Sequence, residues 1–155
     1  MRTIDELLSE APFFAEMTDD QLELIVGCAQ NASFKRGSYL MREGEPADTF
    51  FAIRAGRVAL EVFVPNRGGL TVETIDAGEL LGWSWLVPPY RTHIDARALE
   101  TTRTIAFDGA CLRGKCEEDP ALGYELMRRF MPVVVDRLQA TRGRLLDLYG
   151  KVGAD

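Results

Sequence analysis

The sequence predicts a single, mainly β domain flanked by helices. Three observations predict it: short strand-like runs between glycine turns fill the middle of the 155-residue chain, a helical pattern precedes them, and a longer helical pattern follows. Roughly eight such runs at regular spacing are typical of an antiparallel sandwich or barrel-like roll. We expect one domain, 1–155, with N-terminal helices over 1–30, a β-roll over 31–110 and C-terminal helices over 117–150.

Two short helices are expected before the strands, over Ile4 to Leu8 and over Thr18 to Cys28. Thr18 is a favourable N-cap residue, and the two aspartates that follow it suit the positive end of the helix dipole. Apolar residues recur at helical spacing in the second segment, which predicts a face that packs on the rest of the domain. These residues are Leu22, Ile25, Val26 and Ala29.

The expected strands begin near Ala32, where the helical period is lost. The runs Phe50–Ile53 and Val58–Val64 are separated by a glycine-containing turn, and a second such turn leads into the alternating run Leu70–Ile75. Both turns predict β-hairpins. The segment Ile94–Phe107 is rich in threonine, alanine and isoleucine, which predicts one or two further strands.

The insert Gly78–Arg97 is the candidate small-molecule site, because it is rich in loop-forming residues and carries both tryptophans and the only histidine. Gly78 and Gly82 can adopt conformations closed to other residues, and a glycine turn lets backbone amides approach an anion. On an extended chain, Trp83 and Trp85 would share one face. Two interpretations stay open, a ligand pocket and a well-packed connection between strands.

The last helical segment runs from Asp119 to about Tyr149, and Pro132 is expected to kink it or to start a new helix. Apolar residues stepping by four and three draw one seam along it, as a and d positions do. We predict a homodimer through this seam, with coverage of the β core as the alternative. The predicted dimer residues are Met127, Met131, Val134, Leu138 and Leu145.

Composition limits the partners. The net charge of −6 disfavours nonspecific binding to nucleic acid or to an anionic membrane. The N-terminus lacks the apolar core of a signal peptide, and no apolar run reaches membrane-spanning length. The three cysteines have no CxxC motif and no neighbouring histidine, so we expect neither a disulfide framework nor a zinc site. A reducing cytoplasm suits such a chain best.

Enzymatic functions find little support in the sequence. A cupin-type metal site needs two or three histidines, and the chain has one. The run Gly82–Leu86 lacks the second glycine of a nucleophile elbow, and the cysteines have no basic partner nearby. We therefore expect a non-enzymatic protein with no catalytic residues and no metal.

Two segments carry a resemblance to a known family. Residues 44–58 combine a Gly-Glu loop, an acid, an aromatic-rich strand and a G-x-V hairpin, and this order resembles the opening of a cyclic nucleotide-binding domain of the Crp/Fnr-like type. Residues 75–82 resemble that family's entry into its phosphate-binding cassette. The resemblance covers about residues 10–148 and implies a jelly-roll-like β-roll, or double-stranded β-helix, with N-terminal helices and a C-terminal hinge helix. It implies a regulatory sensor, with a cyclic nucleotide (cAMP or cGMP) as the candidate ligand.

The cassette departs from the family's pattern. Family members that bind cAMP or cGMP have a glutamate after the glycine that matches Gly82, and here Trp83 stands there. The family's phosphate-binding arginine falls on Thr92, one residue after Arg91. Trp83 either fills the space of a nucleotide or stacks on a planar ligand. The candidate ligand-binding residues are Gly82, Trp83, Ser84, Arg91, Thr92 and His93, although a single histidine is more often a packing residue.

Other partners follow from the last helix. Many relatives carry a helix-turn-helix after the long helix, and the absence of room for one before Asp155 predicts no direct DNA binding. Arginines concentrate on this helix, and we interpret them as a solvated face. These are Arg128, Arg129, Arg137, Arg142 and Arg144. The alternative function is a vestigial pocket in a dimeric module that binds a protein partner.

Overall fold

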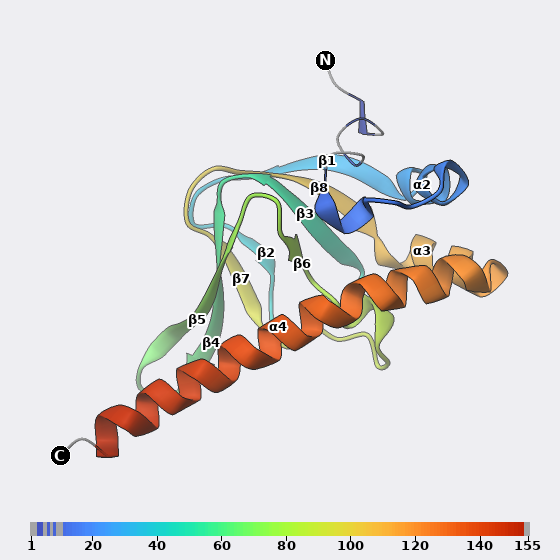
Figure 1. The fold of residues 1–155 in the computed structure, drawn as a ribbon. Coiled ribbons are helices and arrows are strands. Elements are labelled where there is room, and N and C mark those ends of the chain that lie inside the picture. The colour runs from blue at the N-terminus through green and yellow to red at the C-terminus, as the bar shows by residue number, and fades with distance from the viewer. Residues whose placement is uncertain (1–2, 5, 7, 9–10, 154–155) are drawn as a thin grey trace.

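The computed structural model describes residues 3, 4, 6, 8 and 11–153, with side chains to residue 147, and it confirms the expected fold class. Within these residues, eight strands form two four-stranded antiparallel sheets (Figure 1). The strands are β1 (Ala29–Phe34), β2 (Tyr39–Met41), β3 (Thr49–Ala55), β4 (Arg57–Val64), β5 (Gly68–Asp76), β6 (Leu80–Leu81), β7 (Asp95–Ala98) and β8 (Thr102–Asp108). The sheet orders are β1-β8-β3-β6 and β2-β7-β4-β5. Only the β4–β5 connection stays within one sheet, so the chain winds between the sheets as a roll.

Of the two predicted hairpins, the one between β4 and β5 is confirmed, whereas the one between β3 and β4 was wrong, because these strands lie in different sheets and do not pair. Gly56 joins β3 to β4 with a φ of +102°, and a Cβ atom at this position would lie 2.7 Å from the backbone oxygen of Thr101. Only glycine fits such a turn. The second turn pairs β4 with β5 from Arg57 opposite Asp76 to Val64 opposite Gly68. The segment 94–107 was expected to form one or two strands, and it forms two, β7 and β8.

The N-terminal side holds the short helix η1 (Pro12–Phe14) and the helix α2 (Asp19–Val26). Thr18 caps α2 through a reciprocal capping box with Gln21, as expected. The expected end at Cys28 was wrong. Ala29 opens β1 and pairs with Phe107 of β8, because sheet pairing overrides the helical spacing of the apolar residues. The other expected helix, over 4–8, lies partly outside the described residues.

The C-terminal side consists of α3 (Gly109–Glu118) and α4 (Pro120–Gly153). Sequence patterns missed α3, although the Asp108 carboxylate caps it by accepting from the Cys111 amide at 3.0 Å. Of the two expectations at Pro132, a kink or a new helix, the new helix was wrong, because α4 continues through the proline (Figure 1). Tertiary contacts hold α4 on both sides of the proline: Arg129 donates to the Phe13 carbonyl at 2.6 Å, and Arg137 binds the roll.

The core has two parts, one on each face of β3. Phe50 and Ala52 face the helices, and Phe51 and Ile53 face the interior of the roll, as strand alternation requires. On the helical side, Phe50 stacks on Phe107 with ring centroids 4.4 Å apart. The helices therefore cover the outer face of the sheet that contains β3 and β8. The other sheet and the insert are not covered in this way.

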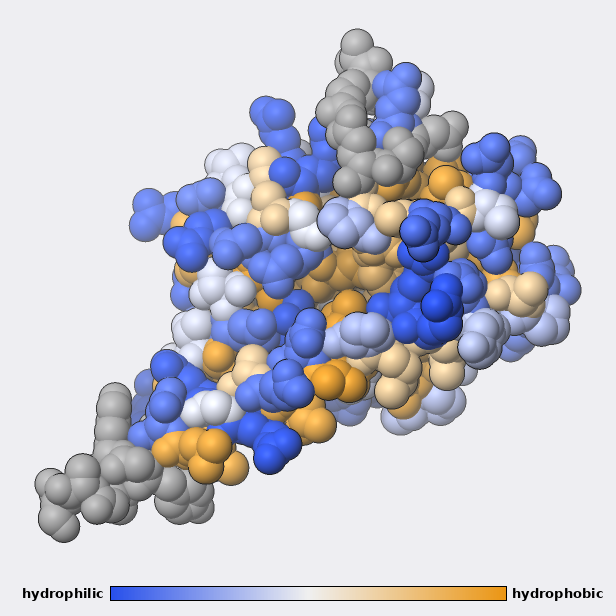
Figure 2. All heavy atoms as spheres, in the orientation of Figure 1, coloured by the Kyte–Doolittle hydropathy of each residue, from blue (hydrophilic) through white to orange (hydrophobic). Residues whose placement is uncertain are grey.

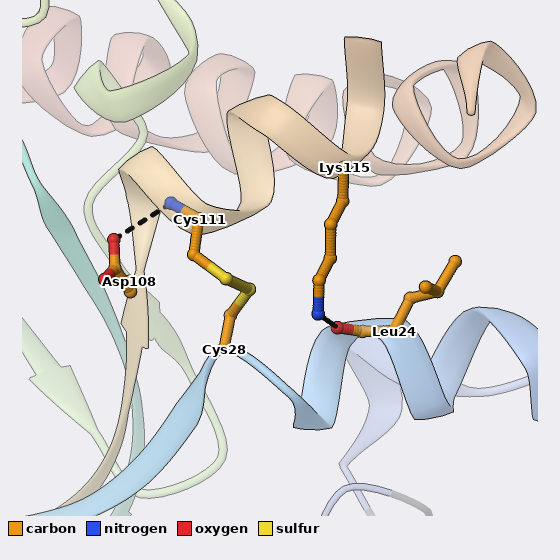
Figure 3. The surroundings of a disulfide bond; sticks show 5 residues. All are labelled: Leu24, Cys28, Asp108, Cys111 and Lys115. Atoms are coloured by element: carbon orange, nitrogen blue, oxygen red, sulfur yellow. Dashed lines mark hydrogen bonds between the residues drawn. A yellow bond between two sulfur atoms is a disulfide. The ribbon is translucent and has the colours of Figure 1, made fainter. Parts of the chain in front are cut away.

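A disulfide joins Cys28 to Cys111, which corrects the expectation that these cysteines stay unpaired (Figure 3). Their Cα atoms lie 5.9 Å apart although the residues are 83 positions apart in sequence. The pairing of β1 with β8 brings together the start of one strand and the helix that follows the other. Sequence spacing carries no signal of this proximity.

Candidate functional site

A cavity of about 180 Å³ lies between the second sheet, the insert and helix α4. Its walls combine an apolar interior from the strands with polar side chains from the insert and the helix. The lining residues are Met41, Leu60, Val72, Glu73, Leu81, Gly82, Trp83, Ser84, Thr92, His93, Ile94, Arg137 and Thr141. A concave, largely apolar site with a few convergent polar groups is typical of a small-molecule pocket.

Gly82 fixes how the chain enters this cavity. Its φ is +100°, and a Cβ atom there would lie 2.9 Å from Met41 Cε and 3.3 Å from Phe50 Cβ. A larger residue would therefore be strained and would also collide with the core. The close approach places Trp83 and Ser84 at the wall of the cavity.

The two tryptophans point to different places, so the shared face expected for an extended chain is wrong. Trp83 precedes a 3₁₀ turn, η2 (Ser84–Leu86), in which residues two apart do not align. Trp85 is 1% exposed and stacks on Phe50 at 4.8 Å in the core. Trp83 instead lines the cavity and stacks on the His93 ring, with centroids 5.7 Å apart.

Five of the six candidate ligand-binding residues line the cavity, namely Gly82, Trp83, Ser84, Thr92 and His93. The sixth, Arg91, lies elsewhere: its Nη1 donates to the Gly44 carbonyl at 3.4 Å, and its backbone bridges Pro46. Thr92 is buried, and its amide donates to the Glu45 carbonyl at 2.9 Å. The insert therefore brings no permanent positive charge to the cavity wall.

The positive charge in the cavity wall comes from α4. Arg137 donates from Nη1 to Glu73 Oε1 at 2.8 Å and from Nη2 to the Leu80 carbonyl at 3.0 Å. The two side chains are 17% and 22% exposed, so water screens this pair only in part. Burial raises the pKa of Glu73, and this effect outweighs the opposing effect of Arg137.

Sequence reasoning missed both members of this pair. It placed Arg137 on a solvated face, and no motif marks Glu73. The structure corrects the interpretation for Arg137 and for Arg129, whose guanidinium binds the Phe13 carbonyl.

Helix α3 contacts the insert through Arg113, a residue that the sequence analysis also missed. Arg113 donates to the Trp85 carbonyl at 2.8 Å, and its guanidinium lies 4.2 Å from the Tyr90 ring centroid. A cation over an aromatic face is attractive. The insert therefore contacts α3 on one side and lines the cavity on the other.

The predicted seam of α4 lies mainly at the surface. Met127, Met131, Leu138 and Leu145 are 52–58% exposed, and Val134 is half-buried. A different stripe covers the core, formed by the buried residues Leu122, Leu126 and Phe130. Figure 2 shows hydrophobic side chains along α4 on the visible face. The seam therefore presents unpartnered apolar side chains.

Neither a membrane-spanning helix nor a metal-binding cluster is found among the described residues. None of the helices there combines the length and apolar character needed to cross a bilayer. In the same part of the chain, no cluster of three or more histidine, cysteine, aspartate or glutamate side chains is arranged to hold a metal ion.

Comparisons with known proteins support the fold and show the family. The model of the cyclic nucleotide-binding domain family matches residues 32–119. The CRP-like cAMP-activated global transcriptional regulator of Mycobacterium tuberculosis is 24% identical over 145 residues, which cover 94% of this chain and 63% of the regulator. The chain therefore spans less than two thirds of that relative.

Solved structures give the same fold. A Geobacter metallireducens protein assigned to cyclic nucleotide binding matches with a TM-score of 0.78 and 34% identity, covering 88% of this chain and 99% of that chain. A cyclic nucleotide-binding domain from Methylobacillus flagellatus matches with a TM-score of 0.76 at 21% identity, over 93% of this chain and 81% of that one. The second likeness supports the fold alone.

Proposed function

The chain belongs to the cyclic nucleotide-binding domain family, and we propose that it is a non-enzymatic sensor whose cavity takes a small ligand and whose helix α4 transmits the binding event. The observation that carries the proposal is that Arg137 of α4 lines the same cavity as the insert. A ligand that fills the cavity therefore meets the long helix directly. Binding energy that differs between two positions of α4 would shift its equilibrium.

The ligand is expected to differ from the family's usual one, or to bind more weakly. Trp83 and Thr92 replace the glutamate and arginine that the family resemblance places at these positions. Each charge-assisted hydrogen bond contributes about 1.5–3 kcal/mol, so the loss of one weakens cAMP or cGMP binding roughly tenfold to a hundredfold. The stacked rings of Trp83 and His93 offer a surface for a planar group.

An anionic group on the ligand has one permanent positive charge to meet in the cavity wall, that of Arg137. Arg137 already binds Glu73, so such a ligand competes with this carboxylate. Competition would change the attachment of α4 to β5. Of the candidate residues, the proposed site keeps the five that line the cavity, and Arg91 serves as a control.

The test is a titration of the full chain with cAMP, cGMP and inorganic phosphate, followed by thermal unfolding and calorimetry. A ligand at a hundred times its dissociation constant adds roughly 2.7 kcal/mol of stability. Arg137→Ala is expected to remove the shift given by an anionic ligand, and Arg91→Ala is expected to retain it. Equal loss in both variants, or in neither, would contradict the proposed site.

A second candidate function is a dimeric module with a vestigial pocket, and the exposed seam of α4 favours it. In this alternative the cavity takes no ligand, and the seam binds a second copy or a protein partner. The absence of a shift with every ligand, combined with a stable dimer, would favour it. Both functions are expected in the cytoplasm.

A further inference from the structure

We infer that the Cys28–Cys111 disulfide is a redox site at which a dithiol reductant loosens the attachment of helix α3 to the roll without unfolding the domain. The inference needs no ligand in the cavity and uses none of its lining residues. It rests on three features: the access to the disulfide, the attachments that remain without it, and the position of α3.

The disulfide is reached from an open depression of about 390 Å³. Both cysteines line it, together with Gly27, Gln30 and Asp48. Cys28 is 6% exposed, whereas Cys111 is only partly buried, so an incoming sulfur meets Cys111 first. Access is one of the factors that separate reactive disulfides from inert ones.

Several noncovalent contacts at the same place do not depend on the sulfur–sulfur bond (Figure 3). The Asp108 amide donates to the Cys28 carbonyl at 2.8 Å, and the Asp108 side chain caps α3 at Cys111. Further along α3, Lys115 Nζ donates to the Leu24 carbonyl at 2.6 Å. These contacts keep α3 seated when the covalent link opens, so the domain stays folded while α3 gains freedom.

Helix α3 contacts both the insert and α4, so greater mobility of α3 affects both. Gly109, its first residue, donates its amide to the Asp48 carbonyl at 2.7 Å, and Arg113 binds the Trp85 carbonyl of the insert. The same helix also packs against α4. The disulfide thus anchors the helix that lies between the insert and α4, and its reduction loosens the support of both.

The reaction is an ordinary thiol–disulfide exchange. One thiolate of the dithiol bonds to Cys111 Sγ, and Cys28 leaves as a thiolate that takes up a proton. The second thiolate of the reductant then forms its internal disulfide and releases Cys111, which is protonated in turn. The two protein sulfurs gain two electrons, and the dithiol loses two. Cys116 takes no part: burial, aided by Asp119, raises the pKa of its thiol, so it stays protonated.

The test uses the oxidised full chain carrying Cys116→Ser, treated with dithiothreitol under native conditions and then alkylated. Mass spectrometry is expected to find both Cys28 and Cys111 alkylated while the far-ultraviolet circular dichroism is unchanged. The melting temperature is expected to fall by on the order of 10 °C. Amide exchange over residues 109–118 is expected to become faster by roughly tenfold or more.

The matched control is the Cys28→Ser/Cys111→Ser pair, in which dithiothreitol is expected to change nothing. If that variant does not fold, the oxidised and reduced forms of the Cys116→Ser chain carry the comparison alone. Alkylation only at denaturant concentrations that unfold the domain would overturn the inference. Loss of the circular dichroism signal on reduction, or unchanged exchange in α3 after full alkylation, would also overturn it.

Discussion

Arg137 of α4 and Glu73 of β5 are 64 residues apart in sequence and form an ion pair across 2.8 Å at the wall of the cavity. The same guanidinium binds the Leu80 carbonyl just before the insert turns at Gly82. One side chain of the long helix therefore contacts the second sheet and the start of the cassette together. This contact joins the candidate ligand site to the candidate dimer helix.

Replacing Arg137 with alanine is expected to destabilise the domain by about 1.5–3 kcal/mol, because its partly buried guanidinium donates hydrogen bonds to Glu73 and to the Leu80 carbonyl, and both are lost. Urea unfolding measures the change. Arg142→Ala, which alters an exposed arginine farther along the same helix, is the control and is expected to change stability by no more than about 0.5 kcal/mol. Equal effects would show that the ion pair contributes nothing specific.

The pH dependence of stability is expected to separate Glu73 from Glu61. Burial raises the pKa of Glu73, so its contribution is present below the unfolded value near 4.5 and is lost as pH rises through the folded value. A hydrogen bond from Arg97 lowers the pKa of Glu61, so its contribution is present above 4.5 and is lost as pH falls through the folded value.

Unfolding free energies of Glu73→Gln and Glu61→Gln across pH 3–8 test this difference. At neutral pH, Glu73→Gln is expected to leave stability unchanged or raise it, whereas Glu61→Gln is expected to lower it. Towards low pH, the original chain is expected to gain stability relative to Glu73→Gln, because protonated Glu73 favours the folded state. Over the same range it is expected to lose its advantage over Glu61→Gln, because Glu61 becomes protonated. Parallel profiles for the two variants would contradict the assigned pKa directions.

Restoring the family's charged pair is expected to create affinity for cAMP. The double change Trp83→Glu and Thr92→Arg supplies a carboxylate for the ribose and a guanidinium for the phosphate, so affinity is expected to rise by at least about a hundredfold. Calorimetry measures it, and circular dichroism checks that the buried position of Thr92 accepts the arginine. Trp83→Glu with Thr92→Lys is the control for charge alone. No gain in a folded double variant would mean that the cavity does not take a nucleotide.

The exposed seam of α4 is expected to form a homodimer. Leu138→Arg places a charge in the predicted interface and is expected to weaken dimerisation by about thirtyfold, or roughly 2 kcal/mol. Gln139→Arg adds the same charge to the exposed neighbouring position and is expected to leave the dimer intact. Sedimentation analysis gives both constants, and a monomeric original chain at every concentration would refute the interface.

Gly82 is expected to tolerate no side chain. Gly82→Ala combines a φ of +100° with contacts of 2.9 Å and 3.3 Å, and a loss of about 2–4 kcal/mol is expected. At Gly78 the φ is similar, +93°, but no atom lies within 4 Å of an added Cβ. The stability lost in Gly78→Ala therefore measures the cost of the backbone conformation alone. Thermal unfolding of both variants isolates the steric part, and equal losses would show that the collision with Met41 and Phe50 relaxes freely.

Local patterns in the sequence determined most of the fold. Glycine turns such as Gly56 fix where the chain reverses because the required backbone conformation excludes other residues, and Thr18 caps α2 through neighbours in the chain. The turn before the alternating run Leu70–Ile75 predicted the hairpin of β4 with β5. Such features depend on residues a few positions apart, so the sequence alone is enough to predict them.

Only the tertiary structure decided which residues meet. The proximity of Cys28 to Cys111 and that of Glu73 to Arg137 arise from the winding of the roll, and no spacing in the sequence encodes either pair. The 3₁₀ turn at Ser84 sent Trp83 to the cavity and Trp85 to the core, although the two residues are near neighbours. Local propensity fixes the elements, whereas the site depends on long-range packing, which sums many weak contacts across the whole domain.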